Sequence, residues 1–114
     1  MTDGSSFFEV TQPVYYVVSM TTKFTSMDEV RAHAPGQLVA HVARSAELHR
    51  AGPLLMAGAF TDHPGEPVAT MGVLTTRADA EEFARADPFV IAGMVDKWEV
   101  RNWGNIFAAM TRHE

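Results

Sequence analysis

The sequence predicts an α+β domain of ferredoxin-like order, β-α-β-β-α-β, built on a four-stranded antiparallel sheet. Three observations lead to this fold class. First, two almost wholly apolar segments lie on either side of a helical region. Second, a turn-rich segment joins the second apolar segment to a third one. Third, another helical region is followed by a final segment in which apolar and polar residues alternate. All of these lie within residues 14–104, so we expect residues 1–13 to form an N-terminal arm and residues 105–114 a C-terminal tail.

The first strand is expected at Val14–Met20, where β-branched and aromatic residues prevail. It is apolar at nearly every position, which is typical of a strand buried on both faces. Ser26, followed three residues later by Glu29, forms a capping box and predicts a helix start. Pro35-Gly36 breaks the helical pattern, so this first helical piece is short.

A longer helix is predicted from about Gly36 to Ala51, and Gly52 is placed to end it. At about 100° per residue, its apolar face carries Leu38, Val42, Ala46 and His49. Its opposite face carries Arg44, Glu47 and Arg50. His41 lies at the border of the apolar face, near Ser45 and Leu48.

The second strand is expected at Pro53–Phe60 and is again apolar throughout. Thr61–Pro67 is dense in turn formers. The third strand follows at Val68–Thr76, so the second and third strands should form a hairpin.

The second long helix is predicted at Arg77–Ala86, with an inward face made of Ala80, Phe83 and Ala84. Asp87-Pro88 interrupts it, and Phe89–Gly93 can form one further turn. The last strand is expected at Val95–Trp103, where Trp98, Val100 and Asn102 alternate with Lys97, Glu99 and Arg101. One face of this strand should therefore be exposed to solvent.

An antiparallel sheet with helices on one face leaves its other face open, and in the first two strands that face is apolar. Monomers rarely expose apolar patches of several hundred Å². We therefore expect two copies to pack sheet against sheet as a dimeric α+β barrel, and thus a homodimer.

Composition excludes several classes of partner. The net charge is −5, and no Lys/Arg cluster exceeds a pair, so nucleic acid is an unexpected partner. The sequence has no cysteine, which excludes disulfides and thiolate metal sites. No signal peptide and no apolar run of about 20 residues is present. We expect a soluble, cytoplasmic protein with no membrane partner.

No general phosphate-binding, nucleophile or metal motif is present. The histidines His33, His41 and His49 are eight residues apart, about 12 Å along a helix. That spacing is too wide for two ligands of one metal ion, so no metal site is expected. His49, on the apolar face, is expected to be a core histidine bonded to a backbone carbonyl. His63 is expected to be a solvated turn residue.

His41 and Asp87 each have a functional and a structural interpretation. A histidine at the border of a helix face can be held through one nitrogen while the other acts as a general base, although border histidines are common. Asp87 before Pro88 is a typical helix N-cap. A carboxylate can equally orient an imidazole as in a catalytic dyad. The two helical regions lie side by side in a ferredoxin-like fold, so the two side chains can meet.

Other side chains are candidates for a substrate pocket. Aromatic residues, Tyr16 and Trp98 among them, either line a barrel interior or pack a core. Met56 and other methionines suit an adaptable apolar pocket and are equally common as core residues. Arg101 could receive a substrate carboxylate. The substrate-binding residues that we predict are Tyr16, Ser45, Met56, Phe89, Trp98 and Arg101.

A set of these residues resembles a known family. His41 precedes Gly52 by eleven residues, and an apolar strand ending in Ala57-Gly58 follows. Later in the chain come the sequence A-D-P-F-V-x-A-G at 86–93 and a last strand that ends in Trp103. This set resembles the YCII-related proteins of the dimeric α+β barrel superfamily over about residues 14–104. The sequence AGPL at 51–54 offers another register, but anchoring on Ala57-Gly58 gives the long helix its full length.

The resemblance implies a His–Asp pair in a cleft beside the barrel, here His41 and Asp87. Similar proteins include a chlorohydroxymuconate dehydrochlorinase, muconolactone isomerases and cyclases of natural-product pathways. The chain departs from the family at Leu38, where many relatives have arginine, and at Arg50-Ala51, where they have an acid-containing pair.

Two functions remain open from the sequence. The first is a cofactor-independent lyase, isomerase or cyclase in a catabolic or biosynthetic pathway, acting on a small unsaturated organic acid or enone through a His–Asp general base. The second is a barrel protein that binds a small molecule without transforming it.

Overall fold

The computed structural model describes residues 14–106, so the expectations for the arm at 1–13 and for residues 107–114 of the tail lie outside the described part. The elements are, in chain order, β1 (Val14–Thr22), α2 (Met27–His33), α3 (Pro35–Ala51), β2 (Leu54–Ala59), β3 (Ala69–Leu74), α4 (Arg77–Arg85), α5 (Pro88–Ile91) and β4 (Val95–Gly104). The predicted β-α-β-β-α-β order is confirmed. Pro35 rather than Gly36 begins the long helix, because proline is well tolerated at the first helical position.

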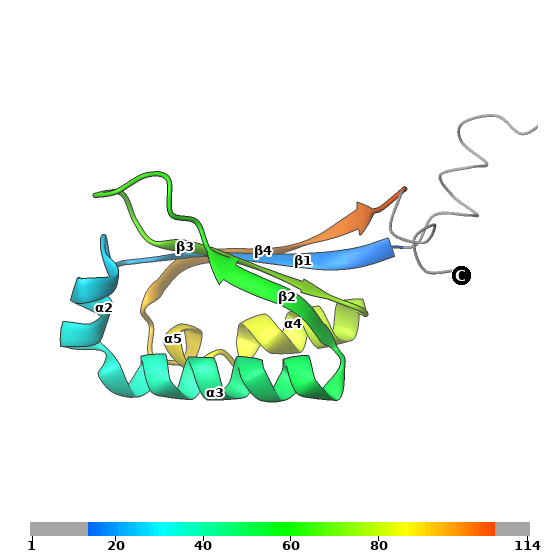
Figure 1. Cartoon of the computed structure of the whole chain (residues 1–114), viewed down its shortest axis with the longest axis horizontal. Coiled ribbons are helices and arrows are strands. Elements are labelled where there is room, and N and C mark those ends of the chain that lie inside the picture. The colour runs from blue at the N-terminus through cyan, green and yellow to red at the C-terminus, as the bar shows by residue number, and fades with distance from the viewer. Residues whose placement is uncertain (1–13, 107–114) are drawn as a thin grey trace, which may run out of the picture.

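The four strands form one antiparallel sheet in the order β2-β3-β1-β4. Helices α3, α4 and α5 lie under one face of this sheet, and α2 stands at one end of it (Figure 1). The predicted hairpin of β2 and β3 is present, with Gly58 opposite Met71. No described helix covers the other face of the sheet (Figure 1).

The main core lies between the sheet and α4. Alternate residues of β1 point into it, and Val18 and Met20 are 1% and 4% exposed. The predicted inward face of α4 is confirmed, since its buried residues are Ala80, Phe83 and Ala84. Gly72 of β3 lies so close to α4 that a Cβ atom there would stand 3.2 Å from the Phe83 ring. This close approach brings the helical layer tightly against the middle of the sheet.

A second core cluster joins α2, α3 and α5 and consists of the buried residues Val30, Ala34 and Phe89. The N-cap predicted at Ser26 is present, since the Glu29 backbone N–H donates to Ser26 Oγ. Glu29 Oε1 accepts from the Thr25 backbone N–H, one residue before the Ser26 N–H that a capping box uses. Phe89 of α5 thus packs against the junction between α2 and α3.

The expected apolar face of α3 does not form the core. Val42 is 56% exposed, Ala46 and His49 are exposed, and no residue of α3 is fully buried. The side of α3 that packs inward carries the half-buried residues Leu38, His41, Arg44, Ser45 and Leu48. Arg44, which we expected on the outer face, bonds to backbone carbonyls of α4.

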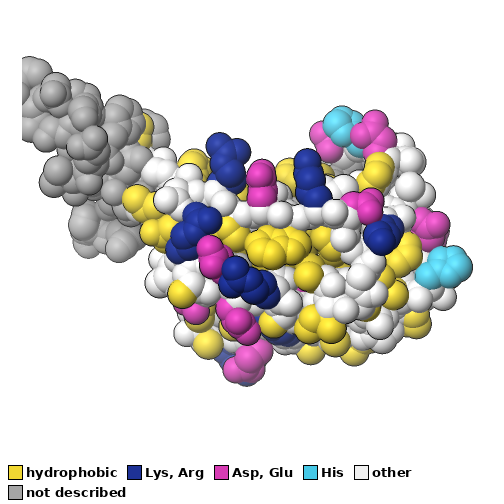
Figure 2. Space-filling model, turned by 180° about the vertical axis from the view of Figure 1, so that it is seen from behind, with side chains coloured by type: hydrophobic (Ala, Val, Ile, Leu, Met, Phe, Trp, Pro, Cys, Tyr) yellow, Lys and Arg dark blue, Asp and Glu magenta, His cyan; other side chains and the backbone are white. Residues whose placement is uncertain are grey.

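Strand β2 is apolar throughout, as predicted, yet little of it is buried. Leu54 is buried, whereas residues 55–59 are exposed, because β2 is an edge strand with one paired neighbour. In β4, Trp98 and Val100 are half-buried while Lys97, Glu99 and Arg101 are exposed, which confirms the predicted alternation at these positions, whereas Asn102 is exposed and does not continue it. On the β4 side of the molecule, apolar side chains form a band between sheet and helices that is bordered by charges of both signs (Figure 2).

Candidate active site

Asp87 stands at the junction between α4 and α5, where its surroundings fix its position. It is the N-cap of α5, and Pro88 occupies the first helical position. Its Oδ2 accepts a hydrogen bond from the Phe89 backbone N–H at 2.9 Å. The residue is 0% exposed. Its structural role as a cap is therefore present, and one carboxylate oxygen remains for a second donor.

That second donor is His41. The Nδ1 atom of His41 lies 2.5 Å from Asp87 Oδ1, although 46 residues separate the two in the chain. Because a carboxylate only accepts, Nδ1 carries the hydrogen in this contact. The Nε2 atom of a neutral His41 is then the unprotonated nitrogen. This is the arrangement in which a carboxylate orients an imidazole that acts through its other nitrogen.

The pair is enclosed on the Asp87 side and accessible on the His41 side. The His41 side chain is 23% exposed, while that of Asp87 is 1% exposed. The Phe89 ring packs against the imidazole at 5.5 Å between ring centroids, tilted by 58°. Phe89 therefore limits movement of the imidazole, and the same residue donates the backbone N–H that holds Asp87.

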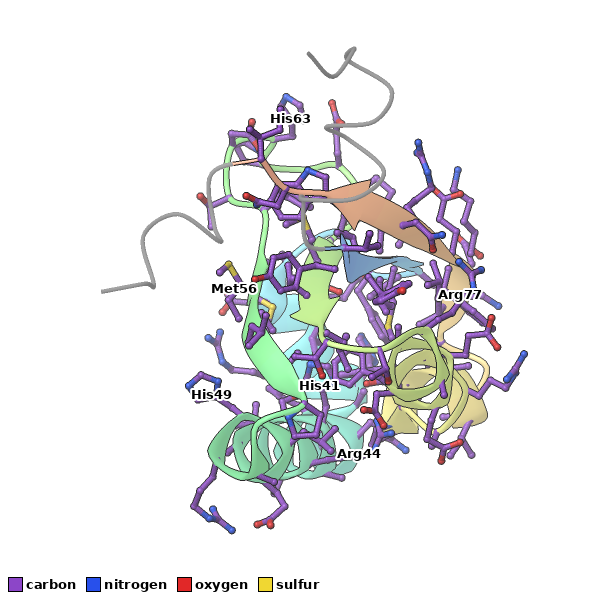
Figure 3. All side chains as sticks on the ribbon, turned by 90° about the vertical axis from the view of Figure 1, so that its right-hand side faces the viewer. His41, Arg44, His49, Met56, His63 and Arg77 are labelled. Carbon is purple, nitrogen blue, oxygen red and sulfur yellow. The ribbon has the colours of Figure 1, made fainter. Side chains whose placement is uncertain are left out.

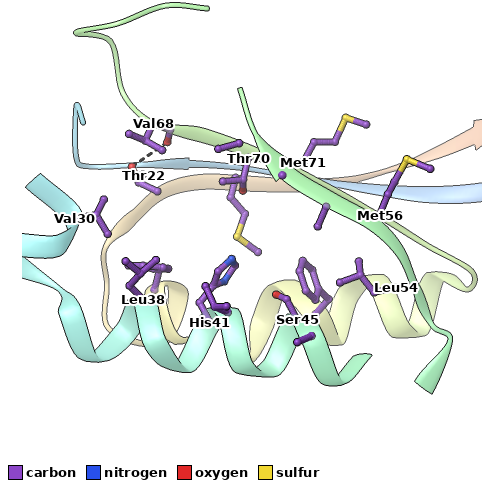
Figure 4. A pocket seen from close by; sticks show the side chains of 18 of the residues that line it. Thr22, Val30, Leu38, His41, Ser45, Leu54, Met56, Val68, Thr70 and Met71 are labelled. Atoms are coloured by element: carbon purple, nitrogen blue, oxygen red, sulfur yellow. Dashed lines mark hydrogen bonds between the residues drawn. The ribbon is translucent and has the colours of Figure 1, made fainter. Parts of the chain in front are cut away.

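His41 borders a cavity of about 600 Å³ between α3 and the sheet. Figure 4 shows the His41 ring rising from α3 into this space. Most of the lining is apolar, and its polar side chains are Thr22, His41, Ser45, His49 and Thr70. Thr22 is already engaged, because its Oγ1 donates to the Val68 carbonyl at 2.9 Å. The volume lies within the range of about 300–1,000 Å³ that is usual for small-molecule sites.

The structure brings three of the predicted substrate-binding residues to this cavity. Ser45 and Phe89 belong to its lining beside His41. Met56 belongs to it through β2, but its side chain points away from α3 (Figure 4). The other three lie elsewhere. Tyr16 and Trp98 pack against the main core, which is the packing role that we gave as their alternative, and Arg101 is exposed on β4 and does not line the cavity.

His49 belongs to the cavity wall, which the sequence analysis did not anticipate. Its Nδ1 bonds to the Leu54 carbonyl at 2.9 Å, as expected, but the side chain is exposed rather than in the core. Viewed along the helices, His41 and His49 leave α3 on different sides (Figure 3). Within residues 14–106, no three His, Asp or Glu side chains are arranged to hold a metal ion.

Arg44 is a further residue that sequence reasoning missed. Its Nη1 and Nη2 atoms each donate at 3.0 Å, to the carbonyls of Phe83 and Glu82. The guanidinium also lies 5.5 Å from the Phe83 ring centroid. Arg44 follows His41 by one helical turn, so these contacts join α3 to α4 close to the pair of His41 and Asp87. The sequence feature that could have identified Arg44 is its position one helical turn after the candidate base His41.

Fold and site together define a ferredoxin-like α+β domain with a buried carboxylate and an imidazole at an apolar cavity, a class able to transfer protons on a bound small molecule. The model of the YCII-related domain matches residues 14–104, and the chain belongs to this family. The predicted resemblance is thereby confirmed. No curated protein sequence matches the chain.

Solved structures share the fold. The chain is similar to the 5-chloro-2-hydroxyhydroquinone dehydrochlorinase TftG from Burkholderia phenoliruptrix AC1100, in complex with 2,5-dihydroxybenzoquinone, with a TM-score of 0.57, 18% identity, and coverage of 80% of this chain and 94% of that one. The name of that dehydrochlorinase specifies a chlorinated hydroquinone and not the muconate that we expected for such a relative.

Two weaker matches were also found. A conserved protein from Methanosarcina mazei Go1 has a TM-score of 0.47 and 12% identity, covering 82% of this chain and 94% of that one. SnoaB, a cofactor-independent oxygenase from Streptomyces nogalater, has a TM-score of 0.42 and 17% identity, covering 81% and 91%. Among the described helices none has the length and apolarity needed to cross a membrane.

Proposed function

We propose that the protein is an enzyme in which His41 acts as a general base on a small, largely apolar carbonyl compound, and Asp87 orients it. The observation that carries the proposal is the His41 Nδ1 to Asp87 Oδ1 contact, combined with the position of His41 in the cavity wall. Elimination, isomerisation and ring closure can all begin with removal of a proton beside a carbonyl group. This proton transfer requires no bound cofactor.

In the proposed mechanism, His41 Nε2 takes a proton from the carbon next to the carbonyl. The imidazolium that forms keeps its Nδ1–H on Asp87, whose negative charge stabilises it. The proton is then returned to another atom of the same molecule in an isomerisation, or to the departing group in an elimination. The burial of the Asp87 side chain keeps water from that side of the pair, which strengthens its interaction with the imidazolium.

The substrate class follows from the cavity. Its lining is mostly apolar with a few polar side chains, which suits an unsaturated cyclic acid, enone or quinone. The dehydrochlorinase of the same fold is named for a chlorinated hydroxyhydroquinone, and its complex holds a dihydroxybenzoquinone. We therefore place oxygenated rings first among the compounds to be tested.

The direct test measures proton removal and not a particular product. Cyclic enones, hydroxyquinones and unsaturated acids are incubated with the protein in D₂O, and exchange of the hydrogens beside the carbonyl is followed by proton NMR. His41→Asn is the informative variant, because the asparagine amide can still donate to Asp87 while the Nε2 base is lost. We expect exchange to slow by about 10²–10⁴.

Matched controls separate chemistry from folding. His63→Asn makes the same substitution in the 60–68 loop, outside the lining of the cavity, and should exchange like the wild-type protein. An exchange rate unchanged in His41→Asn contradicts the general-base role. A wild-type protein that binds these compounds and accelerates exchange in none of them supports the alternative function, a non-catalytic binding protein, which the apolar lining of the cavity favours.

A further inference from the structure

Three polar side chains of the cavity wall come from one helix. His41, Ser45 and His49 lie at positions i, i+4 and i+8 of α3, and all three belong to the cavity lining. Successive members are about 6 Å apart along the helix axis and are rotated by about 40°. The row therefore winds from the His41 side chain, 23% exposed, toward the exposed His49 at the cavity rim.

Each member has a polar atom that the fold leaves available. The Nδ1–H groups of the two histidines are directed to acceptors of the protein, Asp87 for His41 and the Leu54 carbonyl for His49. Both neutral imidazoles thus keep Nε2 as a hydrogen-bond acceptor. Between them, the Ser45 hydroxyl makes no hydrogen bond to any side chain or backbone group of residues 14–106.

The opposite wall of the cavity is contributed by the apolar strand β2, which includes Leu54, Ala57 and Ala59. A ligand between these walls meets polar atoms along α3 and only apolar side chains along β2. The two available Nε2 atoms belong to residues about 12 Å apart along α3. That separation is longer than a single six-membered ring, so one small ring at His41 leaves His49 without a ligand partner.

We propose that His41, Ser45 and His49 form a polar track that selects an elongated, rigid, mainly apolar ligand whose reacting end presents a proton to His41 Nε2 and whose far end donates a hydrogen bond to His49 Nε2. One end is held at His41, and the other is held at His49 at the rim. The inference rests on the proposed function in one respect, namely that the His41 end is the reacting end. His49 is a specificity-determining residue that recognises the distal end.

The test uses two probes that cannot react and differ in one oxygen. They are 4,4′-dihydroxybiphenyl, with a phenol at each end, and 4-hydroxybiphenyl, with a phenol at one end. Binding is measured by calorimetry at about pH 8, where an ordinary imidazole is neutral and a phenol keeps its proton. The wild-type protein should bind the two-ended probe more tightly by about three- to ten-fold, the effect of one additional neutral hydrogen bond.

The informative variant is His49→Asn, whose amide can still donate to the Leu54 carbonyl while the Nε2 atom is removed. We expect its affinity for the two-ended probe to fall to that for the one-ended probe, which should itself stay unchanged because it can use His41. The one-ended probe should lose affinity only in the double variant His41→Asn/His49→Asn. His63→Asn, the control outside this cavity, should leave both affinities as in the wild type.

Three outcomes overturn the proposal: equal wild-type affinities for the two probes, an equal loss of both in His49→Asn, or no loss of either in that variant. The last would mean that His49 only ties the end of α3 to β2. Because binding is measured without turnover, these outcomes are independent of the exchange experiment on His41→Asn. A protein with no general-base activity can still show the two-ended preference.

Discussion

At the scale of single residues, Asp87 combines a structural and a chemical task by using its two oxygens separately. Oδ2 accepts the Phe89 backbone N–H at the start of α5, and Oδ1 accepts the Nδ1–H of His41. Both partners donate, so the site is matched to a carboxylate with two acceptor atoms. The interpretations of Asp87 as an N-cap and as the partner of His41 are therefore compatible.

Asp87→Asn should lower stability as well as activity. Asparagine has one acceptor oxygen, so if that oxygen keeps the Phe89 N–H, its NH₂ group faces His41 Nδ1, which can accept from it only when the imidazole proton moves to Nε2 and the base is lost. Because the buried carboxylate of Asp87 accepts both hydrogen bonds, loss of its charge should cost about 1–3 kcal/mol in the free energy of unfolding. Urea denaturation followed by circular dichroism measures this value. A variant as stable as the wild type would show that the two bonds are dispensable for folding.

The pH dependence of turnover provides a second test of His41. A general base of the imidazole type accepts a proton only in its neutral form, so protonation removes it from the reaction. Turnover should therefore fall as the pH is lowered and show one inflection on the acidic side. A cavity that acts only by shaping its ligand predicts a profile without this inflection. Rates are to be measured at saturating substrate, together with a binding curve at each pH.

At the scale of secondary-structure elements, two hydrogen bonds link α3 to α4 close to His41. Arg44 reaches across to the last turn of α4, where the Glu82 and Phe83 carbonyls accept its two N–H groups. Positive charge near the C-terminus of a helix is favourable because the helix dipole is negative there. The same contact ties α3 to α4 one helical turn after His41, while Val42 lines the cavity despite being 56% exposed.

Arg44→Ala should destabilise the fold by about 1–3 kcal/mol, since it removes two charge-assisted hydrogen bonds and the packing on Phe83. Arg50→Ala is the matched control on the same helix. Arg50 pairs only with Glu47 at the surface, and such pairs contribute about 0.3–0.5 kcal/mol. Thermal and urea unfolding of both variants measures the difference. Equal effects would show that Arg44 does not anchor α3.

At the scale of the whole molecule, the face of the sheet opposite the helices has no described element over it (Figure 1). Residues of β1 that alternate with the buried Val18 and Met20 belong to this face, among them Val17, which pairs with Val73 and Arg101. We propose that a second copy covers this face, as the apolar pattern of β1 predicted. The alternating charges of β4 then lie at the margin of the interface.

Val17→Asp should yield a monomer, because burying a carboxylate in a packed interface is costly even when the neighbouring Arg101 pairs with it. Light scattering should give twice the 12.5 kDa chain mass for the wild type and 12.5 kDa for the variant. Val39→Asp, on the outer side of α3 where Val39 is 70% exposed, should remain a dimer. A monomeric wild type, or a dimeric Val17→Asp protein with unchanged circular dichroism, contradicts this mode of association.

The order of elements, the caps at Ser26 and Asp87 and the end of α3 at Gly52 could be predicted from sequence because each depends on residues within one or two helical turns. The sequence identified each member of the pair separately as a candidate site residue: His41 because it lies at the border of a helix face, and Asp87 because it precedes a proline. The family motif connected them without showing a contact.

The tertiary structure alone decided the inward side of α3, the exposure of β2, the role of Arg44 and the place of His49 in the cavity. These features depend on how a helix is rotated about its axis and on which strand lies at the edge of the sheet. Both are determined by contacts between residues far apart in the chain, such as Arg44 with Phe83 and His41 with Asp87. A periodic pattern identifies a helix and its apolar face, but it contains no information about the partner against which that helix packs.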